Sequence, residues 1–339
     1  MRIHRFAKSV ARTLLHKGGG LHDVRFWNRD AFRILMYHDF PSYPGMQKAL
    51  AKQFDHINRY YHAVTMTDIA RHLTDGSPLP KNALAVTIDD GGRDFLLSAY
   101  PVFKAYKIPS TVYLVSGFLD KKLWLWWDQI ELMINESRLT SFHLPLIPGA
   151  SPTPFVIGTS EEREQAIEFI KEAMKKLREA ERISILNKLP KLLDVELPKN
   201  PPPHMEPLDW SEVRYLSQNG VEIGAHTVTH PILSRITDPV ELLVEIGDSK
   251  KRIEEELQQP VKHFCYPYGR WGLFDEKTVK AVEQCQFDTA VTAEWGFNVQ
   301  GVHPLKLRRL AMEPKTPEHY FHEALAGAHP AKNRENPLP

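Results

Sequence analysis

Four residues of this chain have the types and the spacing that metal-dependent hydrolysis requires. Asp89 and Asp90 end one apolar run, and His226 and His230 follow a second one far downstream. Adjacent carboxylates at a buried strand end repel each other and cost desolvation energy, so a cation between them is favoured. Two imidazoles and one carboxylate form a ligand set for a catalytic divalent metal, and the other carboxylate can take a proton from water. The sequence therefore predicts a metal-dependent hydrolase.

Apolar, strand-like runs alternate with helix-like segments along most of the chain. This alternation is typical of a parallel α/β sheet or barrel. We expect strands at 33–37, 84–88, 110–115, 221–225, 261–266, 289–292 and 305–311. Helical periodicity predicts helices at about 68–73, 95–106, 210–218, 239–258, 275–283 and 317–325.

Several of these expected strands end in polar or turn-forming residues. The ends carry His38, Asp89, Ser116, His226 and the turn at 266–269. Function in a parallel α/β fold gathers at the carboxyl ends of the strands. The convergence of these residues predicts one active site on one rim of the fold.

The segment at 137–207 departs from this alternation. It begins with a stretch rich in proline and apolar residues, continues as a charged amphipathic helix, and ends in a proline-rich connector. We therefore expect a helical and proline-rich insertion at about 137–207 within a catalytic domain at 31–326. A basic extension at 1–30 precedes this domain, and a polar, disordered tail at 327–339 follows it.

The composition is that of a soluble globular protein with a sizeable core. The 339 residues are 42% hydrophobic and 25% charged, and the formal net charge of +1 argues against nucleic acid as a partner. Cys265 and Cys285 are the two cysteines, and they form no CxxC pair. A disulfide framework and a thiolate metal site are therefore disfavoured.

The first 20 residues carry five basic side chains, and no acidic residue precedes Asp23. They lack the continuous apolar segment of a secretory signal. One interpretation is a short basic amphipathic helix that rests on an anionic membrane surface or acts as a transit peptide. The other is a solvated basic helix or frayed terminus. We expect a cytoplasmic protein with peripheral membrane contact through this segment.

Three motifs, in this order, resemble those of the polysaccharide deacetylase family, which has the NodB homology domain of carbohydrate esterase family four. The motifs are TIDDG at 87–91, HTVTH at 226–230 and FCYPYG at 264–269. The resemblance covers about 32–312. The MYH sequence at 36–38 is similar to the subgroup that includes poly-N-acetylglucosamine deacetylases.

The resemblance implies a distorted (β/α) barrel of about seven parallel strands and N-deacetylation of an acetylated amino sugar. It implies that Asp89 is the catalytic base and that Asp90, His226 and His230 bind one divalent metal ion. His2Asp ligation suits Zn²⁺ but also Co²⁺, Ni²⁺ or Fe²⁺. The backbone N–H of Tyr268 corresponds to the donor that stabilises the tetrahedral oxyanion.

Two features depart from the family pattern. The arginine that usually precedes the Pro-Tyr-Gly sequence is absent, since Cys265 or Tyr266 stands in that region. Arg309 on the last expected strand is our candidate for its duty of orienting the base. The usual C-terminal Leu-x-His acid is also missing. The subgroup resemblance indicates His38 as the general acid, and His303 is the weaker candidate.

Some of these residues could instead have a purely structural role. His38 could be a hydrogen-bonded histidine at a strand end, and Arg309 could be a surface or salt-bridge arginine. Trp124, Trp126 and Trp127 could stack on sugar rings or pack the insertion onto the barrel.

The leading hypothesis is a hydrolase that removes N-acetyl groups from an amino sugar in a polysaccharide or glycolipid precursor. A first alternative is a metal-dependent amide hydrolase of a small non-sugar substrate. A second is a catalytically inactive, carbohydrate-binding barrel. The intact set of Asp89, Asp90, His226 and His230 argues against the inactive barrel.

Overall fold

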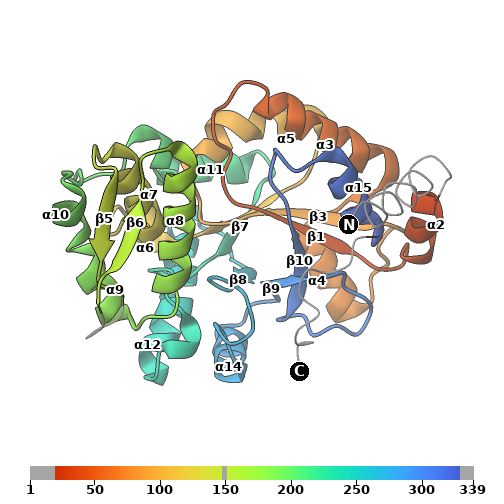
Figure 1. Cartoon of the computed structure of the whole chain (residues 1–339). Helices are drawn as coiled ribbons and strands as arrows, with labels where there is room; N and C mark the ends of the chain where they lie inside the picture. The colour runs from red at the N-terminus through yellow and green to blue at the C-terminus, as the bar shows by residue number, and fades with distance from the viewer. Residues whose placement is uncertain (1–19, 147–150, 329–339) are drawn as a thin grey trace. The chain divides into compact units, whose positions relative to one another are not determined.

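The computed structural model describes residues 20–146 and 151–328 (Figure 1). Contacts divide the chain into two compact units. The larger comprises the described residues up to Leu119 and from Pro207, and the smaller is Asp120–Glu206. The smaller unit thus begins before the insertion boundary expected at 137. The basic segment at 1–19 and nearly all of the expected tail lie outside the described residues.

Seven parallel strands close into a barrel in the larger unit. Their order around the barrel is β1, β3, β4, β7, β8, β9 and β10, and β1 closes it by pairing with both β3 and β10. These strands are β1 (Arg33–Tyr37), β3 (Ala83–Ile88), β4 (Thr111–Leu114), β7 (Glu222–Ala225), β8 (His263–Cys265), β9 (Thr289–Trp295) and β10 (Leu307–Ala311). A short β2 (His62–Ala63) pairs with β3 outside this ring. The predicted distorted barrel is confirmed.

Helices surround the strands, and Figure 1 shows α3, α5 and α15 on one side and α14 on the other. The helices of this unit are α2 (Gly20–Trp27), α3 (Met46–Tyr60), α4 (Met66–Asp75), α5 (Tyr100–Tyr106), α6 (Ser116–Leu119), α11 (Trp210–Gln218), α12 (Pro239–Leu243), α13 (Ser249–Leu257), α14 (Glu276–Gln284) and α15 (Glu318–Ala326). Of the helices described in the chain, none combines the length and the apolar character needed to cross a bilayer.

Two helices that the sequence predicts as continuous contain π-helical turns. The helix expected at 95–106 consists of the π turn η1 (Phe95–Ala99) and α5. The helix expected at 239–258 consists of α12, the π turn η4 (Val244–Asp248) and α13. Such turns are frequent at functional sites because they redirect side chains.

The strands are apolar on both faces because each face is buried. One buried cluster contains alternate strand residues such as Ile34, Ala85, Tyr113 and Cys265. The intervening residues belong to the main core with the helices. Burial on both sides explains why the sequence shows continuous apolar runs in place of an alternating pattern.

Glu222, at the start of β7, fixes helix α4 at the amino ends of the strands. Its carboxylate accepts hydrogen bonds from the backbone N–H groups of Met66 (2.8 Å) and Thr67 (3.1 Å) and from the Thr111 hydroxyl (2.8 Å). Thr111 begins β4. Helix α4 thus covers the amino end, and the carboxyl end is left for the functional residues.

The smaller unit contains helices and one antiparallel hairpin. Its elements are α7 (Trp126–Glu136), β5 (Ser141–Leu144), β6 (Thr153–Val156), α8 (Ser160–Met174), α9 (Glu179–Leu186) and α10 (Leu189–Leu193). The expected amphipathic helix is present as α8, which Thr159 and Glu162 begin with a reciprocal capping box. Trp126 is buried beneath the Arg182 guanidinium, which lies 5.1 Å from its ring, so this tryptophan packs the unit's interior.

Candidate metal-dependent active site

Asp90, His226 and His230 come together just beyond the carboxyl ends of β3 and β7. Asp90 Oδ1 lies 3.4 Å from His226 Nε2 and 3.5 Å from His230 Nε2, and the two Nε2 atoms are 3.2 Å apart. One potential ligand atom from each residue lies within 4.8 Å of the other two. These distances allow the three side chains to share one ion.

The chemistry of this donor set fits a divalent cation. His226 Nδ1 lies 2.7 Å from the Cys265 carbonyl oxygen, so Nδ1 donates and Nε2 is the nitrogen left to face a cation. Burial lowers the pKa of His226, but the neighbouring Cys265 and Asp90 raise it well above its ordinary value, and a cation at Nε2 would take the place of that proton. Burial and the neighbouring His226 lower the pKa of His230 to about 3, which keeps the His230 ring neutral. Asp90 Oδ1 is buried and accepts no hydrogen bond. A buried carboxylate oxygen without a donor is costly unless a cation compensates it.

The backbone at this site adopts conformations that are uncommon for residues with side chains. Asp90 (φ 73°), Thr227 (φ 69°), His230 (φ 59°) and Tyr268 (φ 60°) all lie in the left-handed region. Such strain persists only where surrounding structure enforces it, and it clusters at functional sites. Neither the apolar runs nor the motif spacing predicts these left-handed backbone conformations.

Glu245 holds the loop that carries His230, and we did not anticipate this role from the sequence. Its carboxylate accepts hydrogen bonds from the backbone N–H groups of Val228 (3.0 Å) and Thr229 (2.9 Å) and from the Thr229 hydroxyl (2.7 Å). Thr227 Oγ1 accepts the His230 N–H at 3.0 Å. The π turn η4 contains Glu245, and no local pattern distinguishes it from other helical glutamates.

Ser116 and Gly117, which follow β4, hold the other side of this loop. The Ser116 N–H donates to the Thr227 carbonyl (3.1 Å), and the Gly117 N–H donates to the Val228 carbonyl (2.9 Å). The expected turn after the third apolar strand thus belongs to the same rim, as a support for the histidine loop.

Arg309 of β10 grips Asp89 with two parallel hydrogen bonds. Nη1 donates to Oδ1 and Nη2 to Oδ2, each at 2.7 Å, and both side chains are buried. Arg309 also donates from Nη1 to Thr87 Oγ1 (3.0 Å) and from Nε to the Thr292 carbonyl (2.7 Å). Burial alone would raise the pKa of Asp89, but the Arg309 guanidinium outweighs it and holds that pKa well below its usual range. Asp89 is therefore a fixed carboxylate.

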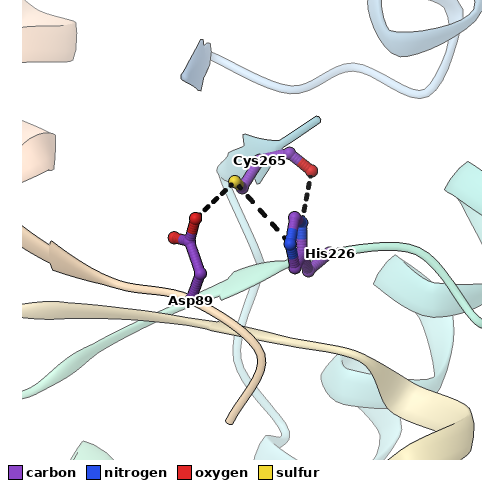
Figure 2. A group of neighbouring side chains, drawn as sticks. All are labelled: Asp89, His226 and Cys265. Carbon is purple, nitrogen blue, oxygen red and sulfur yellow. Dashed lines mark hydrogen bonds between the residues drawn. The ribbon is translucent and has the colours of Figure 1, made fainter. Parts of the chain in front are cut away.

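Cys265 lies beside this pair, and Figure 2 shows it between Asp89 and His226. Its Sγ lies 3.4 Å from Asp89 Oδ2 and 4.0 Å from His226 Nε2. Arg309 Nη2 lies 3.2 Å from the same sulfur. Asp89, His226 and Cys265 are thus close enough to bind a cation. However, Arg309 already occupies Asp89, and burial raises the pKa of the Cys265 thiol. The Asp90 set is the better metal site.

His38 follows β1 and faces Asp89 from the open side of the site. Its Nε2 lies 3.6 Å from Asp89 Oδ2, and its side chain is 45% exposed, so substrate can reach it. His303 lies in the loop between β9 and β10, where its Nδ1 accepts the Leu305 N–H at 3.1 Å. That loop enters β10 at its amino end, whereas the metal ligands follow carboxyl ends. The topology therefore favours His38 over His303 as the general acid.

Tyr268 is positioned by the turn that follows β8. Its ring packs edge-on against the His230 ring with centroids 4.8 Å apart. Gly269 follows with φ 60°, and a Cβ atom there would lie 2.4 Å from the Ala293 nitrogen. The close approach of β9 thus requires glycine and fixes the Tyr268 backbone beside a metal ligand. Its role as oxyanion donor stays a prediction.

Residues 76–290, more than half of the chain, match the family model described as Polysaccharide deacetylase. The chain belongs to the polysaccharide deacetylase family. Among curated proteins, "Putative polysaccharide deacetylase YxkH" of Bacillus subtilis is 30% identical to this family member over 111 residues, 33% of the chain and 38% of the relative. The "Poly-beta-1,6-N-acetyl-D-glucosamine N-deacetylase" of Escherichia coli K12 is 26% identical over 102 residues, 28% of the chain. The chain spans 38% and 15% of these relatives' lengths.

Solved structures share the fold of this polysaccharide deacetylase. IcaB from Ammonifex degensii aligns over 88% of the chain and 97% of its own, with 16% identity and a TM-score of 0.56. The Streptococcus pyogenes deacetylase PplD aligns over 84% of the chain and 93% of its own, with 18% identity and a TM-score of 0.54. At such identities the likeness establishes the barrel and no more.

Proposed function

We propose that this polysaccharide deacetylase removes N-acetyl groups from an amino sugar in a polysaccharide or glycolipid precursor, with one divalent metal ion. The observation that carries the proposal is the placement of Asp90, His226 and His230 within ligand distance of one another, beside the fixed carboxylate of Asp89. Family membership and the name of the Escherichia coli relative support an acetylated amino sugar as the substrate class.

Two imidazoles and one carboxylate suit Zn²⁺, and Co²⁺, Ni²⁺ or Fe²⁺ are alternatives that the same donors accept. When bound, the ion would acidify a water molecule and polarise the acetamide carbonyl. The remaining chemistry belongs to residues of the chain.

Asp89 takes the proton from the attacking water. Arg309 keeps the carboxylate ionised and fixes its plane, because both of its oxygens are held at 2.7 Å. His38 then supplies the proton that the departing amine requires, because an amide anion is a very poor leaving group. The backbone N–H of Tyr268 is the proposed donor to the oxyanion. Under these assignments the acid, the base and the oxyanion donor would act on one rim of the barrel.

A panel of N-acetylated oligosaccharides tests this proposal through acetate release. We expect activity that a chelator abolishes and added metal restores. Asp89→Asn should keep bound metal but lose acetate release by about 10²–10⁴-fold, the usual contribution of a general base. His226→Ala or His230→Ala should lose both metal and activity. Unchanged turnover in Asp89→Asn would contradict the mechanism, and absence of acetate release from every glycan would contradict the substrate class.

The cytoplasmic location with peripheral membrane contact stays a proposal. The basic segment on which it rests, residues 1–19, lies outside the described part of the chain. Fractionation of cells that express the full chain, compared with a variant whose five basic residues in this segment are replaced by glutamine, tests it directly.

A further inference from the structure

The two histidines of the candidate metal site are held in different ways. His226 directly follows β7, and its backbone N–H extends the pairing with β4 by donating to the Leu114 carbonyl at 2.9 Å. Its ring is oriented by the Cys265 carbonyl oxygen, which lies 2.7 Å from Nδ1. His230 lies four residues further along, in the loop beyond the strand. The position of the His230 ring therefore depends on the contacts that hold this loop.

The backbone of the loop is strained. Thr227 (φ 69°) and His230 (φ 59°) both lie in the left-handed region, which is unusual for residues with side chains and most of all for a β-branched threonine. Such conformations persist only where the surrounding structure enforces them. Without that support the loop would relax, and His230 Nε2 would leave its place 3.2 Å from His226 Nε2 and 3.5 Å from Asp90 Oδ1.

The Glu245 carboxylate supplies much of this support. Its Oε2 accepts hydrogen bonds from the backbone N–H groups of Val228 (3.0 Å) and Thr229 (2.9 Å). Its Oε1 accepts the Thr229 hydroxyl at 2.7 Å. Hydrogen bonds from backbone N–H groups to a carboxylate are charge-assisted and stronger than those between neutral groups. One side chain thus holds two consecutive residues between the strained Thr227 and His230.

The main chain of Glu245 contributes as well, because the residue belongs to the π turn η4. A π turn is wider than an α-helical turn and has a different hydrogen-bond spacing. The Glu245 carbonyl accepts the Val228 N–H at 3.1 Å, a donor outside its own helix. The turn itself is fixed by the buried Ser249, whose hydroxyl donates to the carbonyl of the buried Ile246 at 2.8 Å. The element that carries Glu245 is therefore anchored in the core.

We propose that Glu245 is a positioning residue that sets the affinity of the site for a divalent metal ion, by fixing His230 relative to Asp90 and His226. The inference rests on the proposed function, which requires that ion. Glu245 holds the backbone of the ligand loop and acts on the ion only through His230. Groups that orient metal ligands in this way contribute about 10–100-fold to metal affinity.

The test measures Zn²⁺ binding to the whole metal-free chain by competition with a chromogenic chelator. We expect Glu245→Ala to raise the Kd for Zn²⁺ about 10–100-fold. Glu245→Gln should stay within roughly three-fold of the wild type, because its amide oxygen can still accept the two backbone N–H groups. Glu241→Ala and Glu241→Gln, at an exposed position of α12, are the matched controls and should leave the Kd unchanged.

Two further measurements separate positioning of the ligand from a loss of folding. Thr229→Val removes the hydroxyl hydrogen bond at an exposed residue, so it should fold normally and raise the Kd by roughly two- to ten-fold. This variant decides the question even where Glu245→Ala does not fold. In the Co²⁺-loaded proteins, the visible absorption of Glu245→Ala should differ from that of the wild type, because a displaced His230 changes the geometry of the ligands.

Wild-type Kd values and an unchanged Co²⁺ spectrum in Glu245→Ala and Thr229→Val would overturn the positioning role, even if the Tm of the metal-free variants falls. Deacetylation by the proposed mechanism would remain intact in that case. Failure of the wild-type protein to bind Zn²⁺ or Co²⁺ would instead overturn the metal site on which the proposed function rests.

Discussion

The carboxylate of Asp89 is paired here with an arginine from β10, a different strand from the one that the family pattern uses. In the family pattern an arginine precedes the Pro-Tyr-Gly turn, but here β8 carries the small thiol of Cys265. The Arg309 guanidinium enters from β10 and lies 3.2 Å from Cys265 Sγ while it grips Asp89. The absence of the family's arginine made Arg309 a candidate, but only the barrel shows that the small thiol of Cys265 leaves room for it.

Replacement of Arg309 by lysine should change the pH dependence of catalysis. Lysine keeps the positive charge but cannot form two parallel hydrogen bonds, so the pKa of Asp89 should rise toward its ordinary value. A base with a higher pKa becomes protonated at a higher pH, so the acidic limb of the kcat/KM profile should move to higher pH. We expect kcat to fall about ten- to hundred-fold. Arg308→Lys, one residue earlier on β10, is the control, and an acidic limb at the same pH in Arg309→Lys would contradict this role.

His38→Ala should lower turnover by about 10²–10⁴-fold while metal content stays intact. The reason is that His38 faces Asp89 and does not belong to the Asp90, His226 and His230 set. Elemental analysis of the purified variant together with acetate release measures both quantities. His303→Ala should behave as wild type, and the reverse pattern would assign the acid to His303.

At the scale of secondary-structure elements, the Asp94 side chain connects the loop after β1 with the start of η1. Its carboxylate accepts hydrogen bonds from the backbone N–H groups of Phe40 and Phe95. The two segments that it connects carry His38 and the Asp89-Asp90 pair. Burial raises the pKa of Asp94 to about 6 even though these donors oppose the shift.

The raised pKa of Asp94 predicts how the free energy of unfolding changes with pH. Because the folded state holds this proton more tightly than the unfolded state, the contribution of Asp94 to stability falls as pH rises from about 4 to about 6. Asp94→Asn should remove this fall, which we place on the order of 1–3 kcal/mol. Urea denaturation at pH 4, 5, 6 and 7 measures it. A constant difference between the two proteins across that range would contradict the assignment.

The sequence predicts the positions of helices and strands better than it predicts the backbone conformations of single residues. Seven apolar runs located the seven barrel strands, and α11 has the bounds that its periodicity predicts. The hairpin of β5 and β6 was missed because its strands are short and proline interrupts the second one. The π turns and the left-handed Asp90, His230 and Tyr268 depend on tertiary contacts, such as those of Glu245, that no local pattern encodes.

At the scale of the whole molecule, the metal ligands join parts of the barrel that are far apart in the sequence. Asp90 follows β3, whereas His226 and His230 follow β7, and β4 lies between these strands. A cation that binds this set only in the folded state adds its binding free energy to folding. The metal is therefore expected to stabilise the barrel as a whole.

Zn²⁺ should raise the Tm of the protein after chelator treatment. At a free concentration 1,000 times the Kd, linkage gives about 4 kcal/mol, which corresponds to a shift of several degrees. Differential scanning calorimetry with and without added metal measures the shift. The Tm of His230→Ala should rise little when metal is added, whereas the Tm of His303→Ala should rise as much as that of the wild type. An equal shift in His230→Ala would place the ion elsewhere.

Asp89 contacts His38 and Arg309, which follow or belong to the first and the last strands of the barrel. A nascent chain on the ribosome has its metal ligands long before β10 emerges from the exit tunnel. Until then the carboxylate has no guanidinium beside it, and the ring of strands is open. Under the proposed mechanism, a chain that ends before Arg309 lacks both the closing strand and the guanidinium, and we expect it to be inactive.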